Sequence, residues 1–265
     1  MSAAAPAGRT AVVYGGSGAI GRSVGRALAR DGAQVYLAGL RRERLDSAAA
    51  HVGAAGADVV DVLDEAAVER HAASVVDRAG RIDVCVNAVG FAIGQQGVAL
   101  VEHTTDEYMA PVAAYIRGSF TTAAVAARHM RGAGGGVIVA LSPPMAAQPA
   151  PLAGPFGVAG AAVENMCRQL ALELAQQRVR VVCLRLTGMP ETARSLGSHT
   201  GEMWGRAAAR LGVPLEEMLD AIGATPVGAP LTVDHVAEVA AFIATDRSEA
   251  LTGTVVNVTR GAIVD

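Results

Sequence analysis

Short β-rich runs alternate with helix-length amphipathic segments along the whole chain, and this alternation constrains the fold more than any other feature. The expected strands are residues 10–14, 34–38, 58–62, 83–86, 137–141, 179–184 and 254–258. The expected helices are residues 20–30, 41–51, 64–79, 105–130, 159–177 and 233–245. Such alternation predicts a mostly parallel sheet with helices on both of its faces.

The strands are apolar throughout, which is typical of parallel strands that helices cover on both faces. No linker, repeat or low-complexity block divides the 265 residues. The sequence therefore predicts a single-domain, doubly wound α/β sheet over 1–265. Residues 191–230, with a looser helical region at 202–222, depart from the alternation. We expect them to form a variable lid over the substrate site, because ligands bind beyond the carboxyl ends of such strands.

Composition excludes several classes of function. All 22 basic residues are arginine, so lysine Schiff-base chemistry and a P-loop lysine are excluded. A net charge of −3 argues against nucleic-acid binding. The three cysteines are too few and too widely spaced for a metal site, and we expect none. Prolines interrupt the uncharged stretch 132–163, so no membrane span is expected, and the absence of a signal-peptide core predicts a cytoplasmic protein.

A glycine-rich segment joins the first expected strand to the first expected helix. It reads Gly15-Gly16-Ser17-Gly18-Ala19-Ile20-Gly21. Glycines permit a tight turn and a close approach of a pyrophosphate, and the N–H groups at the start of the helix face the phosphates. We expect a dinucleotide to contact five residues here: Gly15, Ser17, Gly18, Ile20 and Gly21. A plain strand-to-helix turn is the alternative.

The end of the second expected strand bears on the choice of cofactor. An NAD site often has an acidic residue there to bind the ribose hydroxyls. Here Arg41 and Arg42 follow Gly39-Leu40 instead. Arginines at the start of a helix oppose its dipole, so an anionic partner would explain them, and we expect the 2′-phosphate of NADP. A solvated arginine face is the alternative, and NAD or a vestigial cofactor site is the less favoured interpretation.

The chain resembles the short-chain dehydrogenase/reductase family over nearly its full length. Gly15, Ala19 and Gly21 match the family's T-G-x-x-x-G-x-G loop, with Tyr14 for the threonine and Ala19 for a glycine. Three further segments resemble the family's adenine-contacting Asp-Val, its N-N-A-G and its P-G-x-x-x-T, and they are Asp61-Val62, Asn87-Ala88-Val89-Gly90 and Thr187–Thr192.

The resemblance implies a Rossmann fold with an oxidoreductase-type dinucleotide site. It implies cofactor contacts from Asp61, Val62, Asn87, Ala88, Gly90 and Thr192. The expected helices 105–130 and 159–177 are rich in alanine and resemble the helices through which the family dimerises. We therefore expect a homotetramer or a homodimer.

The family's four catalytic residues, an Asn, a Ser, a Tyr and a Lys, are all replaced. Their positions hold Tyr115, Pro143 or Pro144, Phe156 and Gly160. Phe156 cannot donate the proton that an alkoxide needs after hydride transfer, and Gly160 supplies no charge. Positioned acid–base groups contribute about 10²–10⁴-fold each. We therefore do not expect ketone reduction by the family's mechanism.

Three other residues are candidates for catalysis. Tyr115 is larger than Asn and could fill the space at Gly160 with its hydroxyl toward the pocket, or it could simply pack. Glu164 shares a helical face with Phe156 and Gly160 and could act as a base, or it could be a solvated or interface residue. His199 in the lid could act as an acid or base near neutral pH, or it could be an exposed loop histidine.

Two functions from different classes remain open. The first is an NADP(H)-binding enzyme that acts on an apolar small molecule by non-standard chemistry, either an atypical reduction or a redox-neutral cyclisation, isomerisation or dehydration. Four residues could line its pocket, although core packing explains them equally well: Met145, Met189, Met203 and Trp204. The second is a catalytically inactive binding or regulatory module that pairs with an active relative or senses NADP(H).

Overall fold

The computed structural model describes residues 8–91, 96–196 and 200–264. Its sheet has seven parallel strands in the order β3-β2-β1-β4-β5-β6-β7. The strands are β1 (Thr10–Tyr14), β2 (Gln34–Gly39), β3 (Gly56–Val59), β4 (Val84–Asn87), β5 (Gly136–Ser142), β6 (Val179–Leu186) and β7 (Thr254–Val258). The strand order reverses between β1 and β4, which is where ligands bind in such sheets. The doubly wound architecture is confirmed.

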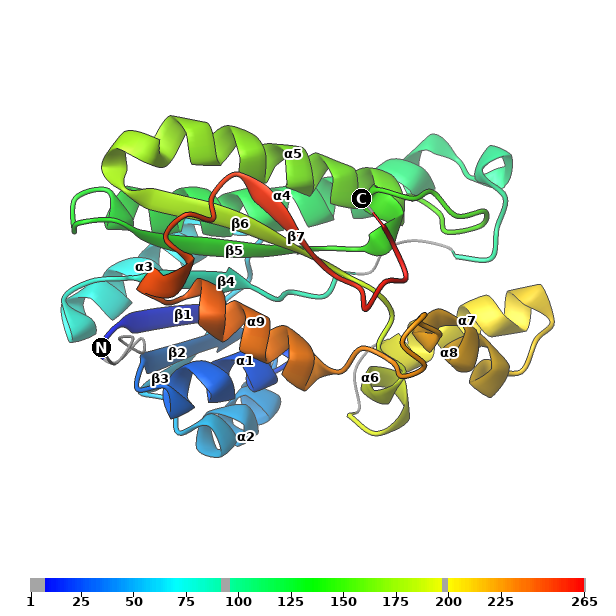
Figure 1. Cartoon of the computed structure of the whole chain (residues 1–265), viewed down its shortest axis with the longest axis horizontal. Helices are drawn as coiled ribbons and strands as arrows, with labels where there is room; N and C mark the ends of the chain where they lie inside the picture. The colour runs from blue at the N-terminus through cyan, green and yellow to red at the C-terminus, as the bar shows by residue number, and fades with distance from the viewer. Residues whose placement is uncertain (1–7, 92–95, 197–199, 265) are drawn as a thin grey trace.

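Six long helices cover the two faces of the sheet (Figure 1). One face packs against α1 (Ala19–Arg30), α2 (Arg42–Val52) and α9 (Val233–Ile243). The other packs against α3 (Glu65–Ala79), α4 (Thr105–Met130) and α5 (Phe156–Leu174). Each face has its own apolar core, which explains why the central strands lack polar–apolar alternation.

Three helices lie within the described part of 191–230, the region for which the sequence predicted a lid. They are α6 (Glu191–Arg194), α7 (Thr200–Leu211) and α8 (Leu215–Gly223). The looser region expected at 202–222 is thus two helices, and Pro214 is the N-cap residue of the second. Single 3₁₀ turns lie at Leu100–Glu102, Pro144–Ala146, Ala175–Gln177 and Asp246–Ser248.

The lid is tied to the loops that follow β4 and β5. Arg210 of α7 donates to the carbonyl of Gln96 at 2.9 Å, and the N–H of Gly97 donates to the carbonyl of Leu152 at 2.9 Å. All three segments lie beyond the carboxyl ends of the strands, at the right of Figure 1. No helix in the described ranges is long and apolar enough to cross a membrane.

Candidate functional site

The turn between β1 and α1 is built on close backbone contacts. Gly15 has φ +78°, and a Cβ there would lie 2.5 Å from the carbonyl oxygen of Ala88. A Cβ at Gly21 would lie 2.3 Å from the carbonyl oxygen of Gly15. Gly18 is the N-cap residue of α1, and no side chain caps the helix there. The N–H groups at the start of α1 therefore remain available to a phosphate, with Ser17 and Ile20 half-buried beside them.

Asn87 braces the end of β4 against α4. Its amide donates to the carbonyl of Gly118 at 3.2 Å and to Oγ1 of Thr122 at 2.8 Å, and its Oδ1 accepts from the N–H of Val89 at 3.0 Å. The side chain is buried and occupied within the protein. Ala88 is half-buried and Gly90 is exposed, so this segment is more accessible than the buried Asn87 side chain.

The two arginines after β2 differ in their surroundings. Arg42 donates a hydrogen bond from Nε to the Asp46 carboxylate at 3.0 Å and one from Nη1 to the carbonyl of Ala57 at 3.3 Å. Arg41 is the exposed N-cap residue of α2, and its side chain forms no hydrogen bond or ion pair within the described part of the chain. Of the two, Arg41 is the one whose guanidinium is available to an anion.

The Asp61-Val62 pair follows β3, which ends at Val59 and is shorter than the expected strand at 58–62. The exposed Asp61 carboxylate accepts from the N–H of Leu63 at 2.9 Å. Val62 is buried, 2.9 Å from the position of a Cβ at Gly118. The pair therefore lies on the turn out of β3, with the acid toward solvent and the valine toward α4.

Three aromatic rings, one after β4, one on α4 and one at the start of α5, form a chain of ring contacts. The Tyr115 ring centroid is 5.3 Å from that of Phe91 and 6.2 Å from that of Phe156. The Tyr115 hydroxyl donates to the carbonyl of Leu141 at 2.9 Å, and burial raises the pKa of Tyr115 well above its usual value. The Tyr115 hydroxyl proton is therefore engaged by a backbone carbonyl. The sequence analysis had not identified Phe91 as a neighbour of Tyr115.

Gly160 and Pro143 lie against each other. β5 ends at Ser142, so Pro143 and Pro144, the two residues that the resemblance offers for the family's serine position, directly follow the strand. A Cβ at Gly160 would lie 2.4 Å from Cδ of Pro143 and 3.1 Å from Cβ of Ala146. The expectation that Tyr115 fills the space at Gly160 is wrong, because Pro143 and Ala146 are the nearest neighbours. The proline ring occupies the volume where a side chain at 160 would begin.

Glu164 is part of a buried ionic cluster one turn after Gly160. It accepts from Nε of Arg185 at 2.8 Å, from Nη2 of Arg185 at 2.9 Å and from Oγ of Ser142 at 2.8 Å. Glu164 is 3% exposed, so the alternative of a solvated residue is wrong. The cluster joins α5 to β6 and β5, whose register pairs Ser142 with Arg185. Sequence reasoning missed Arg185, although an arginine directly after an apolar strand was the available signal.

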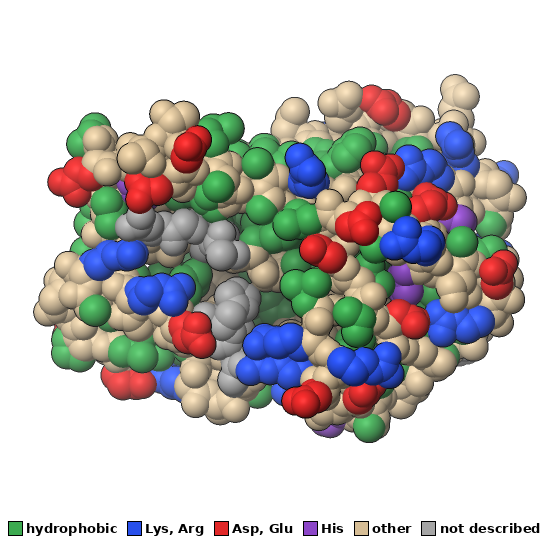
Figure 2. All heavy atoms as spheres, turned by 180° about the vertical axis from the view of Figure 1, so that it is seen from behind, with side chains coloured by type: hydrophobic (Ala, Val, Ile, Leu, Met, Phe, Trp, Pro, Cys, Tyr) green, Lys and Arg blue, Asp and Glu red, His purple; other side chains and the backbone are tan. Residues whose placement is uncertain are grey.

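The residues singled out in and near 191–230 lie in different surroundings. Thr192 is buried, and its hydroxyl donates to the carbonyl of Met189 at 2.7 Å and lies 3.0 Å from Oγ1 of Thr200, so it joins α6 to α7. His199 lies outside the described residues. Met203 and Trp204 belong to the same apolar core as Tyr115 and the helices of that face. Seen from behind, the molecule is hollowed on the side of the lid, and hydrophobic side chains line the bottom of the hollow (Figure 2).

The site therefore combines an open nucleotide turn with an apolar floor. Within the described ranges, no group of three or more His, Cys, Asp and Glu side chains could hold a metal ion. Of the three catalytic candidates, Tyr115 and Glu164 have their polar atoms bound to internal partners. The phenol of Tyr115 already donates its hydrogen bond to the carbonyl of Leu141, and the chain has no lysine that could supply an ammonium group for proton transfer.

Comparisons with known proteins agree with this geometry. The family model described as "Enoyl-(Acyl carrier protein) reductase" matches residues 16–262. Sorbitol dehydrogenase of Cereibacter sphaeroides is 29% identical over 262 residues, which are 96% of this chain and 97% of that protein. 7alpha-hydroxysteroid dehydrogenase of Clostridium sardiniense is 27% identical over 258 residues, which are 96% of this chain and 93% of that protein.

Solved structures of dehydrogenases and reductases share the fold of this chain. A short-chain type dehydrogenase/reductase from Mycobacterium ulcerans superposes with a TM-score of 0.79 at 26% identity, covering 96% of this chain and 89% of that one. NAD⁺-bound xylitol dehydrogenase shares the fold with a TM-score of 0.83 at 23% identity, covering 95% and 98%. Proteins of this kind use nicotinamide dinucleotides, bind small molecules and commonly form oligomers. The chain belongs to the short-chain dehydrogenase/reductase family.

Proposed function

We propose that this protein binds NADP(H) in the crevice between β1 and β4 and transfers hydride to or from an apolar small molecule, with the proton exchanged with water or with the substrate itself. One observation carries the proposal. Gly15 and Gly21 pack closely against the backbone in the nucleotide turn, whereas a Cβ at Gly160, which by resemblance stands at the position of the family's lysine, would lie 2.4 Å from Cδ of Pro143.

The nucleotide half of the proposal is supported by the turn and by Arg41. The N–H groups at the start of α1 have no side-chain cap, and the N-cap residue Gly18 is exposed, which suits a pyrophosphate at this end of the helix. Arg41 is exposed just after β2, and Gly39-Leu40 at the end of that strand offer no carboxylate to accept hydrogen bonds from the ribose hydroxyls of NAD. A guanidinium there suits the 2′-phosphate of NADP.

The apolar substrate follows from the floor of the site. The Tyr115 ring packs against Phe91 in a tilted arrangement and against Phe156 edge-on, and α7 adds Met203 and Trp204 to the same core. A polar substrate would lose hydration against such a floor without gaining hydrogen bonds, which costs free energy. An apolar molecule gains free energy from the same burial.

Proton exchange without a side-chain relay is the unusual step. Hydride transfer to a carbonyl leaves an alkoxide, which must gain one proton before release. Phe156 has no ionisable group, and the Tyr115 proton is donated to the carbonyl of Leu141. Water entering the hollow, or an acidic group on the substrate, supplies the proton in this proposal. The expected rate is below that of a relative with the full catalytic set, by about 10²–10⁴-fold for each missing group.

A second candidate is a non-catalytic dinucleotide-binding module. The surroundings of Glu164 favour it. The carboxylate oxygens of Glu164 accept hydrogen bonds from Arg185 and Ser142, so they are not available as a catalytic base. In either case we propose a homo-oligomer built on α4 and α5, the helices whose outer surfaces remain after the sheet is covered.

Isotope transfer distinguishes the two candidates. NADPH carrying deuterium at either face of C4 is incubated with the protein and a panel of apolar ketones and enones, after calorimetry has established cofactor binding. We expect deuterium in the reduced product. Tight cofactor binding with no deuterium in any product would favour the module, and the absence of cofactor binding would reject both.

A further inference from the structure

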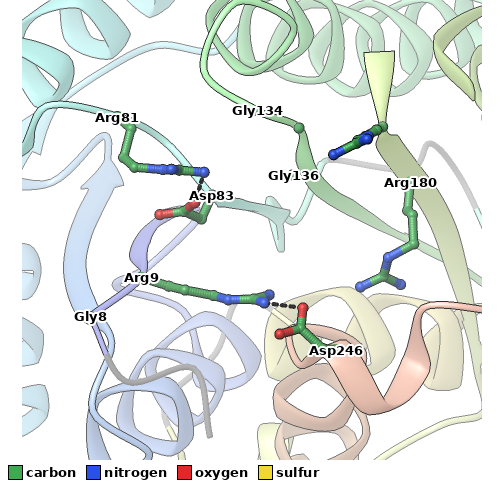
Figure 3. Close-up of a pocket in the computed structure, with 10 residues that line it drawn as sticks. Gly8, Arg9, Arg81, Asp83, Gly134, Gly136, Arg180 and Asp246 are labelled. Carbon is green, nitrogen blue, oxygen red and sulfur yellow. Dashed lines mark hydrogen bonds and ion pairs between the residues drawn. The ribbon is translucent and has the colours of Figure 1, made fainter. Parts of the chain in front are cut away.

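A solvent-open hollow of about 360 Å³ lies at the amino edge of the sheet, opposite the dinucleotide crevice. It is formed where β1, β4, β5 and β6 begin. Four arginines and two aspartates line it, together with a run of three glycines. Figure 3 shows the guanidinium groups of Arg9, Arg81 and Arg180 directed toward one space from separate segments of the chain.

The two aspartates pair with two of the four arginines. Arg81 pairs with Asp83 at 2.5 Å, and Arg9 pairs with Asp246. Within the described residues the hydrogen bonds of Arg180 go to backbone carbonyls: Nη1 donates to Ser248 and Leu251, and Nη2 donates to Ile243 and Thr245. Burial, and then the neighbouring Arg9, lowers the pKa of Arg180. The hollow therefore holds positive charge that its own carboxylates do not neutralise.

Arg178 adds a second guanidinium without a carboxylate. It is exposed, lines the hollow and forms no ion pair within the described ranges of the chain. Its backbone has φ +57°, in the left-handed region that favours glycine. A turn alone would be better served by glycine. An arginine in this conformation brings a charged side chain to the rim at a conformational cost of about 1 kcal/mol.

The glycine run leaves one wall of the hollow without side chains. A Cβ at Gly134 would have no atom within 4 Å, so that position is open space. A Cβ at Gly135 would lie 2.3 Å from the carbonyl oxygen of Arg178, so only glycine allows β5 to begin this close to β6. Gly134 and Gly135 both have positive φ, which glycine adopts without strain.

We propose that this hollow binds a small molecule carrying two or more phosphate groups. Guanidinium forks match phosphate oxygens in geometry and charge, and the exposed Arg178 at the rim has no carboxylate partner within the described residues. The volume is at the lower end of the roughly 300–1,000 Å³ of small-ligand pockets. Arg9 and Arg180 also cap carbonyls at the end of α9, a structural role that accounts for those two residues but not for Arg178.

Calorimetry with pyrophosphate and with ADP, at about 0.15 M ionic strength, tests the proposal. We expect the wild-type protein to bind pyrophosphate, and Arg178→Glu to weaken binding at least about tenfold through loss of a charge-assisted hydrogen bond. Arg178 is exposed, so this variant should fold. Arg70→Glu, at an exposed arginine of α3, is the matched control and should bind like the wild type. Tighter binding of ADP would identify a nucleotide ligand, and equal affinities would show that the phosphates suffice.

Because the turn at Gly15–Gly21 can also take a pyrophosphate, both titrations are repeated with NADPH in excess, which should leave the affinity of the hollow unchanged. Three results would overturn the proposal. They are no binding of either probe at millimolar concentration, an equal loss in Arg178→Glu and Arg70→Glu, and loss of binding when NADPH is in excess.

Discussion

The hydroxyl of Tyr115 lies 2.9 Å from the carbonyl oxygen of Leu141 at the end of β5. Tyr115→Phe removes this one hydrogen bond and keeps the ring between Phe91 and Phe156. We expect the free energy of unfolding to fall by about 0.5–1.5 kcal/mol and deuteride transfer to stay within about twofold. Denaturant unfolding and product analysis measure the two effects. A hundredfold slower transfer at unchanged stability would instead make Tyr115 the proton donor.

Gly160 sets a limit on restoring the family's residues. Because a Cβ at 160 meets Cδ of Pro143 at 2.4 Å, Phe156→Tyr/Gly160→Lys should lose about 1–3 kcal/mol of stability from overpacking. Adding Pro143→Ser should recover stability, whereas adding Tyr115→Asn should not. Thermal melting of the three variants checks this.

A glycine elsewhere provides the control for Gly160. Gly205 lies in α7, and a Cβ there would have no atom within 4 Å. Gly205→Ala should raise stability by up to about 1 kcal/mol through helix propensity, and Gly160→Ala should lower it. If both alanine variants melt above the wild type, Pro143 moves aside at little cost in free energy, and its contact with position 160 does not prevent a larger side chain there.

His71 predicts a specific loss of stability in acid. Burial, opposed by Asp58 and assisted by Arg78, lowers the pKa of His71 to about 4 from 6.5. Between these values the unfolded chain binds a proton that the folded chain does not. The contribution of His71 is therefore complete above about pH 6.5 and is lost as the pH falls toward about 4, up to about 3 kcal/mol.

Denaturant unfolding at about pH 7.5 and about pH 5 measures this contribution. His71→Leu should have a smaller difference in stability between the two values than the wild type. His51→Leu, at an exposed histidine of α2, should keep the wild-type difference. An unchanged difference in His71→Leu would show that another group controls acid stability.

At the scale of elements, the turn from β2 into α2 should select the cofactor. We expect the protein to bind NADPH more tightly than NADH. Arg41→Ala should lower the affinity for NADPH at least about tenfold, because one charge-assisted hydrogen bond is lost. Arg42→Ala should have a smaller effect, because Asp46 and the carbonyl of Ala57 already hold that guanidinium. Calorimetry with both cofactors decides, and equal affinities unchanged by Arg41→Ala would reject a 2′-phosphate site.

The strand–helix alternation was sufficient to predict the sheet, and the ends of elements were harder. β1, β7 and α4 have the bounds expected from the sequence. β3 is Gly56–Val59 rather than 58–62, because the chain leaves the sheet before the apolar run ends. α5 begins at Phe156, directly after Pro155, and ends at Leu174 rather than at 177. Hydropathy reports burial, whereas the end of a strand depends on where its pairing partner ends.

The site was predictable only where it is local in sequence. The glycine turn and the Arg41 position follow from adjacent residues, so their spacing was enough. The partners of Tyr115 and Glu164 are Leu141 and Arg185, which lie 26 and 21 residues away on other elements. Tertiary packing chose these pairs, and a single sequence carries no periodic signal for such contacts.

At the scale of the whole molecule, the outer faces of α4 and α5 are more apolar than a monomer surface needs. Phe120 on α4 and Leu172 on α5 are 50% and 82% exposed. Between the helices lies a groove of about 380 Å³ lined by residues including Phe120, Met166 and Leu170. Exposed apolar area of this kind favours association, since burial contributes about 25 cal/mol per Å².

We expect light scattering at micromolar concentration to give two or four times the mass of one chain, and Phe120→Glu to give monomers. The substitution would bury a charge in the middle of the α4–α5 contact without a partner, which is strongly unfavourable. Val101→Glu, at a 95% exposed apolar residue in the 3₁₀ turn before α4, is the matched control and should remain oligomeric. A monomeric wild type would reject the assembly. Dissociation by Val101→Glu but not by Phe120→Glu would move the interface from the α4–α5 groove to the loops near the lid, where assembly would cover the substrate entrance instead of the back of the sheet.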